Sequence, residues 1–428
     1  MTDRIEQRIN SLNKRLNSEK RFRIYCIGAM SFALAWVLIL FLNIFSSGYS
    51  AFYRTVIQVD VPFLNLIEDT TQFSEMSSED INNLSMYSFS KKAIYRLFPD
   101  IEEKKDKKML IRLFSIEFEQ EIREFLKSNK SNINETETIY LTASDDVDQV
   151  NKGNYPRDLP EDRRRISNFQ LAIYDNFVEN DKISKNFNNY YFTKGDSRDP
   201  ELAGIGGAIV GSIYSILICL LLAFPVAVLA SIYLEEFAPK NKITDFIEIN
   251  INNLAAVPSI VYGLLALQIL LATIQLPRST PLVAGITLAL MTLPRIIIPC
   301  RASLKAVPPS IREGALAVGA SKFQSVFHHV VPLAMPGTLS GTIIGLAQAL
   351  GETAPLILIG MVAFVVDIPS SPIDPSSSLP VQVYLWSESA ERGFVEKTSA
   401  TIMILLTFLM MMNFLAVYLR QKFEKRWN

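Results

Sequence analysis

A single carboxylate interrupts a long apolar stretch near the C-terminal end of the sequence. Glu352 is the only charged residue between positions 337 and 366. A carboxylate at membrane depth is costly, so we expect this group to face a cavity, a positive partner or both. Two roles are open for it. It can form a structural ion pair, or it can accept a hydrogen bond from a protonated anion while repelling an anion that has no proton to donate.

Cations and hydroxyl groups in other apolar stretches are candidate partners of Glu352. Arg295 and Arg301 lie within and just after the stretch 281–300, and either guanidinium could neutralise an anion. Four further candidates for the same pathway are uncharged and are, taken singly, also common as helix-packing groups: Ser259, Tyr262, Gln348 and Thr353.

Other kinds of chemistry find little support in the sequence. Three widely spaced cysteines in apolar runs are interpreted as packing residues, and two adjacent histidines do not make a zinc pattern. We predict no catalytic residue, no metal ligand and no cofactor. With 42 Lys and Arg against 43 Asp and Glu, the formal net charge is −1, which gives no sign of a nucleic-acid partner.

The charges are unevenly distributed, which predicts a polar domain attached to a membrane domain. Residues 46–200 hold 27 acids and 21 bases, whereas much of the remaining chain is apolar. Six apolar stretches have the length of membrane spans: 24–45, 205–234, 254–274, 281–300, 337–366 and 400–419. The first is too long for a cleaved signal sequence, so we interpret it as a retained anchor.

Basic residues predict the orientation of these spans. They gather in 1–23, in the loop 301–332 and after the last span, three segments that a six-span arrangement places on one side, taken as cytoplasmic. The fold class we expect is an all-α polytopic membrane protein with six transmembrane helices and a mixed α/β domain between helices 1 and 2. The expected parts are a cytoplasmic basic tail (1–23), an anchor (24–45), an extracytoplasmic domain (46–200), a five-helix domain (201–420) and a cytoplasmic tail (421–428).

Local patterns suggest elements at the N-terminal side. Met109–Leu126 has apolar residues at four-residue spacing and predicts one amphipathic helix, while Thr138–Ala143 predicts a strand. Ser144–Asp148 lacks the glycine and final glutamate of a calcium loop, so we interpret it as an acidic surface turn. The tail is either a helix on a membrane or partner, or merely a solvated segment; its apolar positions are Ile5, Ile9, Leu12 and Leu16.

Glycines at four-residue spacing predict close helix packing. Gly337, Gly341 and Gly345 form such a ladder in the fifth span, and Gly207 and Gly211 repeat the spacing in the second. Gly351 and Pro355 flank Glu352 and are expected to let that helix bend.

The segment 308–336 predicts two short helices that dock on a partner. Ser310 precedes Glu313 by three residues and Ser321 precedes Gln324 by three, which are capping-box spacings. Gly319 is expected to end the first helix, and Pro332 and Pro336 to end the second. Small residues on the first helix allow close approach, and aromatic residues on the second suit a groove: Gly314, Ala315 and Ala317, then Phe323 and Phe327. Packing against the chain's own bundle is the alternative.

Glu313-Gly314-Ala315, followed by Gly319 and Pro332, resembles the EAA loop of ABC importer permeases. The resemblance implies that the loop 306–336 seats in a cleft of a separate ATPase, with Glu313, Gly314, Ala315, Gly319, Phe323 and Phe327 as the coupling residues. The sequence has Glu-Gly-Ala where Glu-Ala-Ala is usual, and His329 where an aliphatic residue is usual. It contains no Gly-x4-Gly-Lys-Ser/Thr motif, so a P-loop ATPase would be another polypeptide.

Two further runs resemble the PstA family of phosphate ABC transporter permeases, over about residues 201–420. They are Asn253–Leu264 and Ala349–Leu356, and within the second the run Gly351-Glu352-Thr353-Ala354-Pro355 is the more specific. The anchor and the 46–200 domain resemble the N-terminal extension of a longer PstA subgroup, for which the resemblance implies no function. Gln348 departs from the Arg that is common in that family, so the resemblance leaves the neutralising charge to another Arg or to a partner.

The resemblance implies a non-enzymatic subunit of an ATP-driven importer of inorganic phosphate in the bacterial inner membrane, with both termini cytoplasmic. It implies a PstC-like second permease, two copies of a PstB-like ATPase and a periplasmic phosphate-binding protein, in contact with membrane lipid. Two alternatives remain open. One is the same machine with another oxyanion, such as sulfate or molybdate; the other is a membrane-anchored sensor that uses the 46–200 domain.

Overall fold

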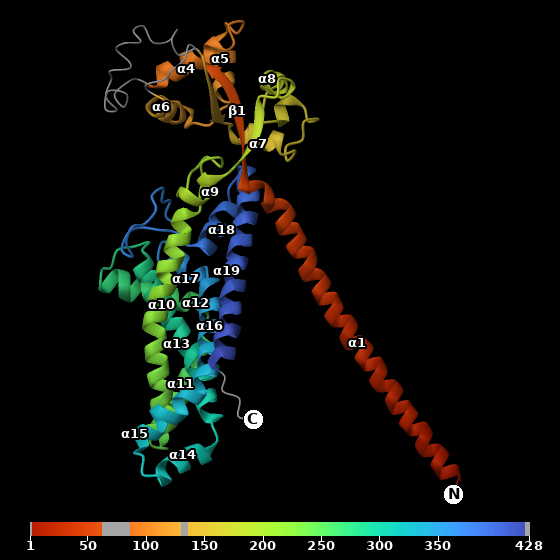
Figure 1. The fold of residues 1–428 in the computed structure, drawn as a ribbon, viewed down its shortest axis with the longest axis vertical. Helices are drawn as coiled ribbons and strands as arrows, with labels where there is room; N and C mark the ends of the chain where they lie inside the picture. The colour runs from red at the N-terminus through yellow and green to blue at the C-terminus, as the bar shows by residue number, and fades with distance from the viewer. Residues whose placement is uncertain (1, 62–85, 130–135, 424–428) are drawn as a thin grey trace.

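The structure is a computed structural model that describes residues 2–61, 86–129 and 136–423, with the side chains of 2–11, 13, 86, 87 and 423 left out. It has a small α/β domain at one end of a helical bundle and a long helix, α1 (Thr2–Gly48), that diverges from the bundle (Figure 1). We call the α/β part, residues 49–205, the outer domain. Ile5 and Ile9 of the N-terminal tail lie outside the described side chains, as do residues 424–428 of the predicted C-terminal tail.

A three-stranded antiparallel sheet forms the centre of the outer domain. Its order is β2-β1-β3, from Glu137–Thr142, Tyr53–Val61 and Ile183–Phe187. Ile57 pairs with Leu141 on one side and Ile183 on the other. Alternate residues of β1 face the core, as the two-residue period of a strand requires. The predicted strand at 138–143 is therefore confirmed, with its bounds one residue earlier.

Short helices cover the sheet, and one prediction about them is wrong. The chain at 109–126 is not one helix, because Phe114 pairs with Ala143 as an isolated β-bridge and draws the backbone toward β2. The apolar stripe survives in α6, where Phe118, Ile122 and Leu126 are buried. The helices of this domain are α4 (Met86–Arg96), α5 (Lys104–Ile111), α6 (Phe118–Ser128), α7 (Asp145–Asn151), α8 (Asn168–Glu179) and α9 (Asn189–Thr193), with 3₁₀ turns at Tyr49–Phe52 and Glu161–Arg163.

The acidic run after β2 is a buried helix rather than the predicted surface turn. Asp145–Asn151 forms α7, and Asp148 is buried. Its Oδ1 accepts a hydrogen bond from the backbone N–H of Thr55 at 2.9 Å. A β1 amide that the sheet leaves without a partner therefore needs this carboxylate, because buried backbone groups must be satisfied.

Five helices of the described chain are long and apolar enough to cross a membrane, or six if one bent pair counts as a single span. Four of the five begin at the predicted residue or earlier, and the remaining one, at Gly206, begins one residue later than predicted. The bundle helices are α10 (Gly206–Ile232), α11 (Lys242–Ala255), α12 (Ser259–Ala266), α13 (Pro281–Lys305), α16 (Val331–Leu350), α17 (Ala354–Leu358), α18 (Leu379–Ser387) and α19 (Gly393–Phe423). Two π-helical turns extend them, Tyr233–Phe237 after α10 and Leu267–Thr273 after α12.

The predicted third and fifth spans differ from the structure. The third is a pair, Lys242–Ala255 and Ser259–Thr273, bent by 99°. Pro258 follows the break, and the residue before a proline disfavours helix. The fifth does not run to 366, because α16 ends at Leu350 and the chain turns before α17.

The glycine ladder of α16 packs against α13, as predicted. A Cβ on Gly341 would lie 2.5 Å from Pro299 Cγ, and one on Gly345 would lie 3.3 Å from Thr292 Cγ2. A Cβ on Gly337 would clash with Ser303. The ladder in α10 serves a different neighbour, because a Cβ on Gly211 would clash with the loop residues Ser376 and Ser377 rather than with a helix.

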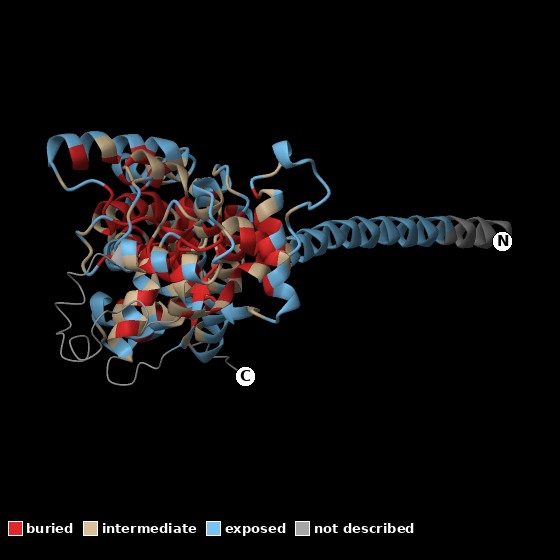
Figure 2. Cartoon of the chain, turned by 90° about the horizontal axis from the view of Figure 1, so that it is seen from above, coloured by how far each residue is buried: buried red, intermediate tan, exposed pale blue. Residues whose placement is uncertain are grey.

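Helix α1 is exposed along its described length (Figure 2). It approaches the bundle closely only at its outer end, where a Cβ on Gly48 would lie 2.7 Å from the backbone nitrogen of Ala400 in α19. Cys26 on this helix is exposed, whereas Cys219 and Cys300 are buried in the bundle as predicted. An apolar helix with no protein neighbour along most of its length is suited to lipid or to another subunit.

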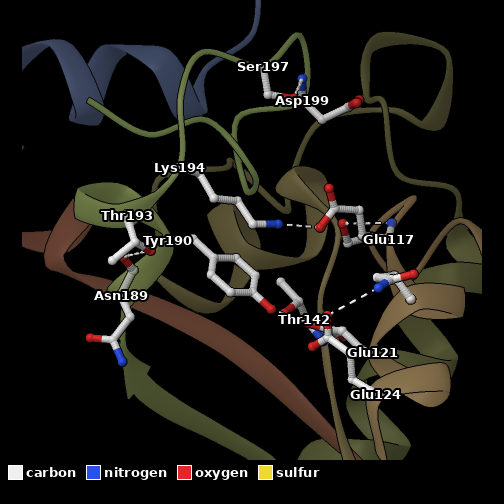
Figure 3. Close-up of polar contacts among 12 residues, drawn as sticks. Glu117, Glu121, Glu124, Thr142, Asn189, Tyr190, Thr193, Lys194, Ser197 and Asp199 are labelled. Carbon is white, nitrogen blue, oxygen red and sulfur yellow. Dashed lines mark hydrogen bonds and ion pairs between the residues drawn. The ribbon is translucent and has the colours of Figure 1, made fainter. Parts of the chain in front are cut away.

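A polar cluster ties α9 to the rest of the outer domain. The guanidinium carbon of Arg54 and Nζ of Lys194 each lie 4.0 Å from the ring centroid of Tyr190. Lys194 pairs with Glu117, and the Tyr190 hydroxyl donates to Glu121 Oε1 at 3.4 Å (Figure 3). Because β1, α6 and α9 all contribute, the cluster holds the chain in place just before it enters α10.

A buried ionic chain joins the outer domain to α19. Lys152 Nζ lies 2.6 Å from Asp148 Oδ2 and 2.7 Å from Glu396 Oε1, and the side chains of Lys152 and Glu396 are 5% and 4% exposed. The hydroxyl of Ser50 donates to Glu396 Oε2 at 2.5 Å. Burial alone would lower the pKa of Lys152, but Asp148 and Glu396 raise it above its ordinary value. The outer domain is thus fixed to the bundle by charges that have lost most of their water.

Two further carboxyl groups at this junction hold protons more readily than usual. Burial raises the pKa of Asp145 to about 7, and Glu201 and Asp148 add to the shift. Burial also raises the pKa of Glu201 to about 7, with a contribution from Asp199. Because these folded-state pKa values exceed the unfolded ones, the stability they contribute is present at low pH and is lost as pH rises through about 7.

Replacing Lys152 with Met should destabilise the chain by about 3–5 kcal/mol, because Asp148 and Glu396 would remain buried without their cation. The thermal unfolding of the detergent-purified full chain measures this. Lys182→Met is the matched control: its partner Asp60 and Lys182 itself are 38% and 36% exposed, so the loss should be about 0–1 kcal/mol. Equal losses in the two variants would contradict the buried chain.

Candidate functional site

Helix α14 (Pro309–Ala317) lies at the end of the bundle opposite the outer domain (Figure 1). Gly319 ends it with a φ of +90°, and Ala320 N–H donates to Ala315 O at 3.1 Å. A left-handed glycine with this hydrogen bond is the Schellman ending that the sequence predicts. The predicted capping box at Ser310 and Glu313 is wrong: Pro308 is the N-cap, and Ser310 already lies inside the helix.

The second predicted helix is not a separate element. Lys322–Ser325 (α15) begins with the predicted capping box, in which Ser321 and Gln324 satisfy each other's backbone N–H groups. A π-helical turn, Val326–Val330, then joins it directly to α16. Pro332 and Pro336 lie within this continuous helix instead of ending it: Pro332 is in the first turn of α16 and Pro336 is inside it.

The predicted coupling residues divide between an outward face and the bundle. Ala315 is buried, whereas Glu313, Gly314 and Gly319 are exposed. Phe323 is 60% exposed, and its ring centroid lies 4.3 Å from that of the half-buried Phe327. The apolar stripe is thus split: Val326 and Val330 fill the core beneath the loop, and Phe323 remains available to another molecule.

An ion pair that the sequence analysis missed anchors α14. Arg312 Nη2 lies 2.5 Å from Glu236 Oε1, in the turn that follows α10, and Arg312 Nε donates to the same carboxylate at 3.1 Å. The guanidinium also donates to the carbonyls of Leu304 and Val307 at the end of α13, at 2.9 and 2.7 Å. The sequence did contain a feature that indicates this ion pair. Glu235 and Glu236 directly follow the second apolar stretch, and carboxylates that become partly buried there need cations nearby.

Arg295 and Glu352 face each other at the turn after α16. Arg295 Nη1 on α13 lies 3.5 Å from Glu352 Oε1, and the two side chains are 25% and 22% exposed. Glu352 lies past the helix, not within it as predicted, because Pro355 has no N–H to donate to Gly351 and the α-helical ladder cannot continue. The structure therefore brings together the carboxylate and one of its two predicted cations.

The runs 253–264 and 349–356 pack against each other. A Cβ on Gly263 would lie 2.8 Å from Cα of Pro355, so α12 and α17 are in backbone contact. The hydroxyl of Tyr262 donates to the carbonyl of Leu254 at 2.8 Å and so closes the bend between α11 and α12. Tyr262 therefore has a structural role in this arrangement.

The remaining pathway candidates take different positions. Arg301 lies away from Glu352 and pairs with Glu248 at 2.6 Å and Glu235 at 3.4 Å. Gln348 is exposed on α16, while Thr353 is half-buried beside Glu352. Ser259 is half-buried at the start of α12. Of the predicted set, Arg295 and Glu352 lie together, whereas Arg301 pairs with acids in α11 and in the turn after α10.

Comparison with known proteins gives the family. A family model described as "Binding-protein-dependent transport system inner membrane component" matches residues 202–425, more than half of the chain. The chain belongs to this family. A second model, "Domain of unknown function (DUF3333)", matches residues 9–161. The permease is therefore a multi-pass membrane protein of ABC importers rather than an enzyme, with an added domain of undefined role.

Curated relatives agree with this family. "Phosphate transport system permease protein PstA 1" of Mycobacterium tuberculosis is 33% identical over 160 residues, which cover 37% of the permease and 51% of the relative. "Probable ABC transporter permease protein YqgH" of Bacillus subtilis is 31% identical over 237 residues, covering 53% and 74%. The resemblance to the PstA family is thus confirmed. The permease spans 33% to 66% of the length of the first curated relatives it matches.

One solved structure, of the MetNI methionine ABC transporter in inward-facing conformations, resembles the permease with a TM-score of 0.41. It is 17% identical and covers 52% of the permease and 95% of that chain.

Removing either member of the Arg295–Glu352 pair should lower the melting temperature, because the other charge is left partly buried without its partner. Arg295→Gln and Glu352→Gln should each be less stable, while the double variant should be no worse than either alone. The measurement is thermal unfolding in detergent. As a control, Arg295→Gln combined with Glu313→Gln, an exposed carboxylate, should show additive effects. Additivity in both pairs would show that Arg295 and Glu352 are not coupled.

Proposed function

We propose that this permease is the PstA-like half of a heterodimeric importer of inorganic phosphate. The proposed partners are a PstC-like permease, two copies of a PstB-like ATPase and a periplasmic phosphate-binding protein. The proposed location is the bacterial inner membrane, with both termini and the loop 306–336 in the cytoplasm and residues 46–200 outside. Relatives named as phosphate transport permeases support the cargo, and the site around Glu352 supplies a physical reason for it.

The pairing of Arg295 with Glu352 is the observation that carries the cargo assignment. Monohydrogen phosphate accepts hydrogen bonds from a guanidinium and donates its own proton to a carboxylate. Sulfate at neutral pH has no proton, so it would face Glu352 with repulsion alone. Gln348 carries no charge, which leaves Arg295 as the cation nearest the carboxylate. Thr353 adds a hydroxyl beside the same group.

Coupling to the ATPase is proposed to run through α14 and the start of α15. Phe323 offers an exposed aromatic surface, and Glu313, Gly314 and Gly319 expose the small-residue face that lets a second protein approach. Arg312 fixes this helix to the ends of α10 and α13, so a displacement of the docked ATPase would reach the membrane helices through hydrogen bonds rather than through a loose loop.

Phe323→Ala should reduce co-purification of the ATPase by about tenfold or more while leaving the permease folded, because an exposed aromatic anchor is lost from the proposed interface. Gly319→Leu should also weaken it, since a leucine at φ +90° strains the helix ending. Tyr140→Ala is the matched control, because Tyr140 is an exposed aromatic residue (55%) of the outer domain, away from the loop 306–336. Full ATPase recovery with Phe323→Ala and Gly319→Leu would contradict this docking surface.

Uptake of labelled phosphate at micromolar concentration tests the cargo. Cells that lack the permease and other phosphate importers should regain uptake when it is re-expressed, and arsenate should compete while sulfate should not. Glu352→Gln should weaken the discrimination against sulfate, because the repulsive carboxylate is gone. Uptake that sulfate or molybdate blocks equally would point to another oxyanion. Phosphate uptake that is unchanged without the permease would favour the membrane-anchored sensor. Deletion of residues 50–200 then separates the two functions, because a sensor would lose all its activity whereas a transporter should keep some uptake.

A further inference from the structure

A cavity at the junction of the outer domain and the bundle has walls from three distant parts of the chain. Its volume is about 320 Å³. The end of α1 supplies Ser47, the outer domain supplies Gln149 and Asn154, and the start of α19 supplies Arg392, Val395 and Glu396. None of these residues takes part in the candidate site around Glu352 or in the coupling loop.

One buried group in this wall lacks a partner. The side chain of Gln149 is 1% exposed, and its Nε2 has no hydrogen-bond partner in the described part of the chain. Its Oε1 accepts from Asn154 Nδ2 at 3.1 Å, which fixes the orientation of the amide. Folded proteins rarely leave a buried amide N–H without an acceptor. An acceptor inside the cavity would satisfy it.

The other polar groups in the wall add donors for a ligand, beside the side-chain oxygen of Asn154 and the carboxylate of Glu396. Arg392 uses Nη1 to donate to Asn154 O at 3.0 Å and lies over the ring of Tyr155, which leaves the rest of its donor fork open. Both oxygens of Glu396 are already engaged, by Lys152 and Ser50. A site that offers an amide N–H, a guanidinium and a serine hydroxyl suits an oxyanion.

We propose that this cavity binds a phosphate group, carried either by free inorganic phosphate or by the headgroup of a membrane lipid. Guanidinium and amide donors recognise phosphate oxygens, and the cavity is larger than a carboxylate needs. Ser47 lies two residues after the apolar stretch 24–45, which places the cavity at the depth of lipid headgroups. The proposal does not depend on what the permease transports.

Nearby charges set the strength of such a site. Asp145, Asp148 and Glu201 lie behind Glu396 and oppose an anion, while Lys152 and Lys397 lie among them and offset that charge. Burial raises the pKa of Asp145 and Glu201 to about 7, so their opposition weakens as pH falls through that value. A bound phosphate would join α1, the outer domain and α19, and would fix the helix that otherwise contacts the bundle only at its outer end.

The test uses the full-length permease in a maltoside detergent and a phosphate-free buffer. Thermal unfolding is followed while inorganic phosphate or dioctanoyl phosphatidylglycerol is added. The variants are Gln149→Met, which keeps the side-chain volume but removes the donor, and Arg392→Gln. Arg163→Gln, an exposed arginine of the outer domain outside the cavity, is the control. Arg295→Gln serves as a second background, so that binding in the proposed transport site is recognised separately.

We expect one of the two probes to raise the melting temperature of the wild type and of both control backgrounds. Gln149→Met should be about as stable as the wild type without the probe, because it removes a buried unsatisfied donor but also the acceptor of Asn154 Nδ2. Its apparent affinity should nevertheless fall about tenfold or more. Arg392→Gln should lose affinity similarly. A response to phosphate alone assigns the free ion, and one to the lipid alone assigns the headgroup. The absence of any response, or equal responses in all variants, would overturn the proposal.

Discussion

A carboxylate removed from water must face a cation or take up a proton, and the first of these solutions organises the permease from one end to the other. Glu236 pairs with Arg312 at the end that carries α14, Glu352 pairs with Arg295 at the turn after α16, and Glu396 pairs with Lys152 below the outer domain. Each pair joins segments far apart in the sequence. Removing one partner of a buried ion pair destabilises a protein by more than the intact pair stabilises it. These contacts therefore fix the relative positions of the segments rather than contribute much net stability.

The parts of the fold that were predictable from sequence are those whose cause is local. Gly319 ends α14 because its left-handed backbone suits glycine, and Ser321 begins α15 because its hydroxyl caps the nearby N–H of Gln324. The ladder of α16 was predictable too, since glycine at every fourth position can only make one flat helix face. Helix breaks were harder, because a hydropathy pattern continues across Pro258 and Gly351 while the hydrogen-bond ladder does not.

The errors arose where a distant partner overrides the local pattern. Residues 109–126 have helical periodicity, but Phe114 pairs with Ala143 and divides the helix. The run 144–148 is acidic enough for a surface turn, yet Asp148 is drawn inside by the N–H of Thr55 and by Lys152. In the candidate site, Arg295 and Glu352 were found through their cost in an apolar stretch, whereas Arg312 was not, because its partner Glu236 lies 76 positions away. A charged residue at the end of an apolar stretch predicts that a partner of opposite charge lies nearby, but the sequence does not show which residue that partner is.

Helix α13 connects the loop 306–336 to the Arg295–Glu352 pair, and the sequence of α13 determines how stiff this connection is. Arg312 holds the carbonyls of Leu304 and Val307 at its lower end, so α14 and α13 move together there. Between that end and Arg295 stands Pro299, which cannot donate to the carbonyl of Arg295 and therefore leaves the helix easier to bend just below the ion pair. Gly341 of α16 packs against this same proline, so bending of α13 would have to displace α16, the helix that ends two residues before Glu352. Both members of the ion pair thus lie on helices that meet at Pro299, where α13 bends more easily than a proline-free helix would.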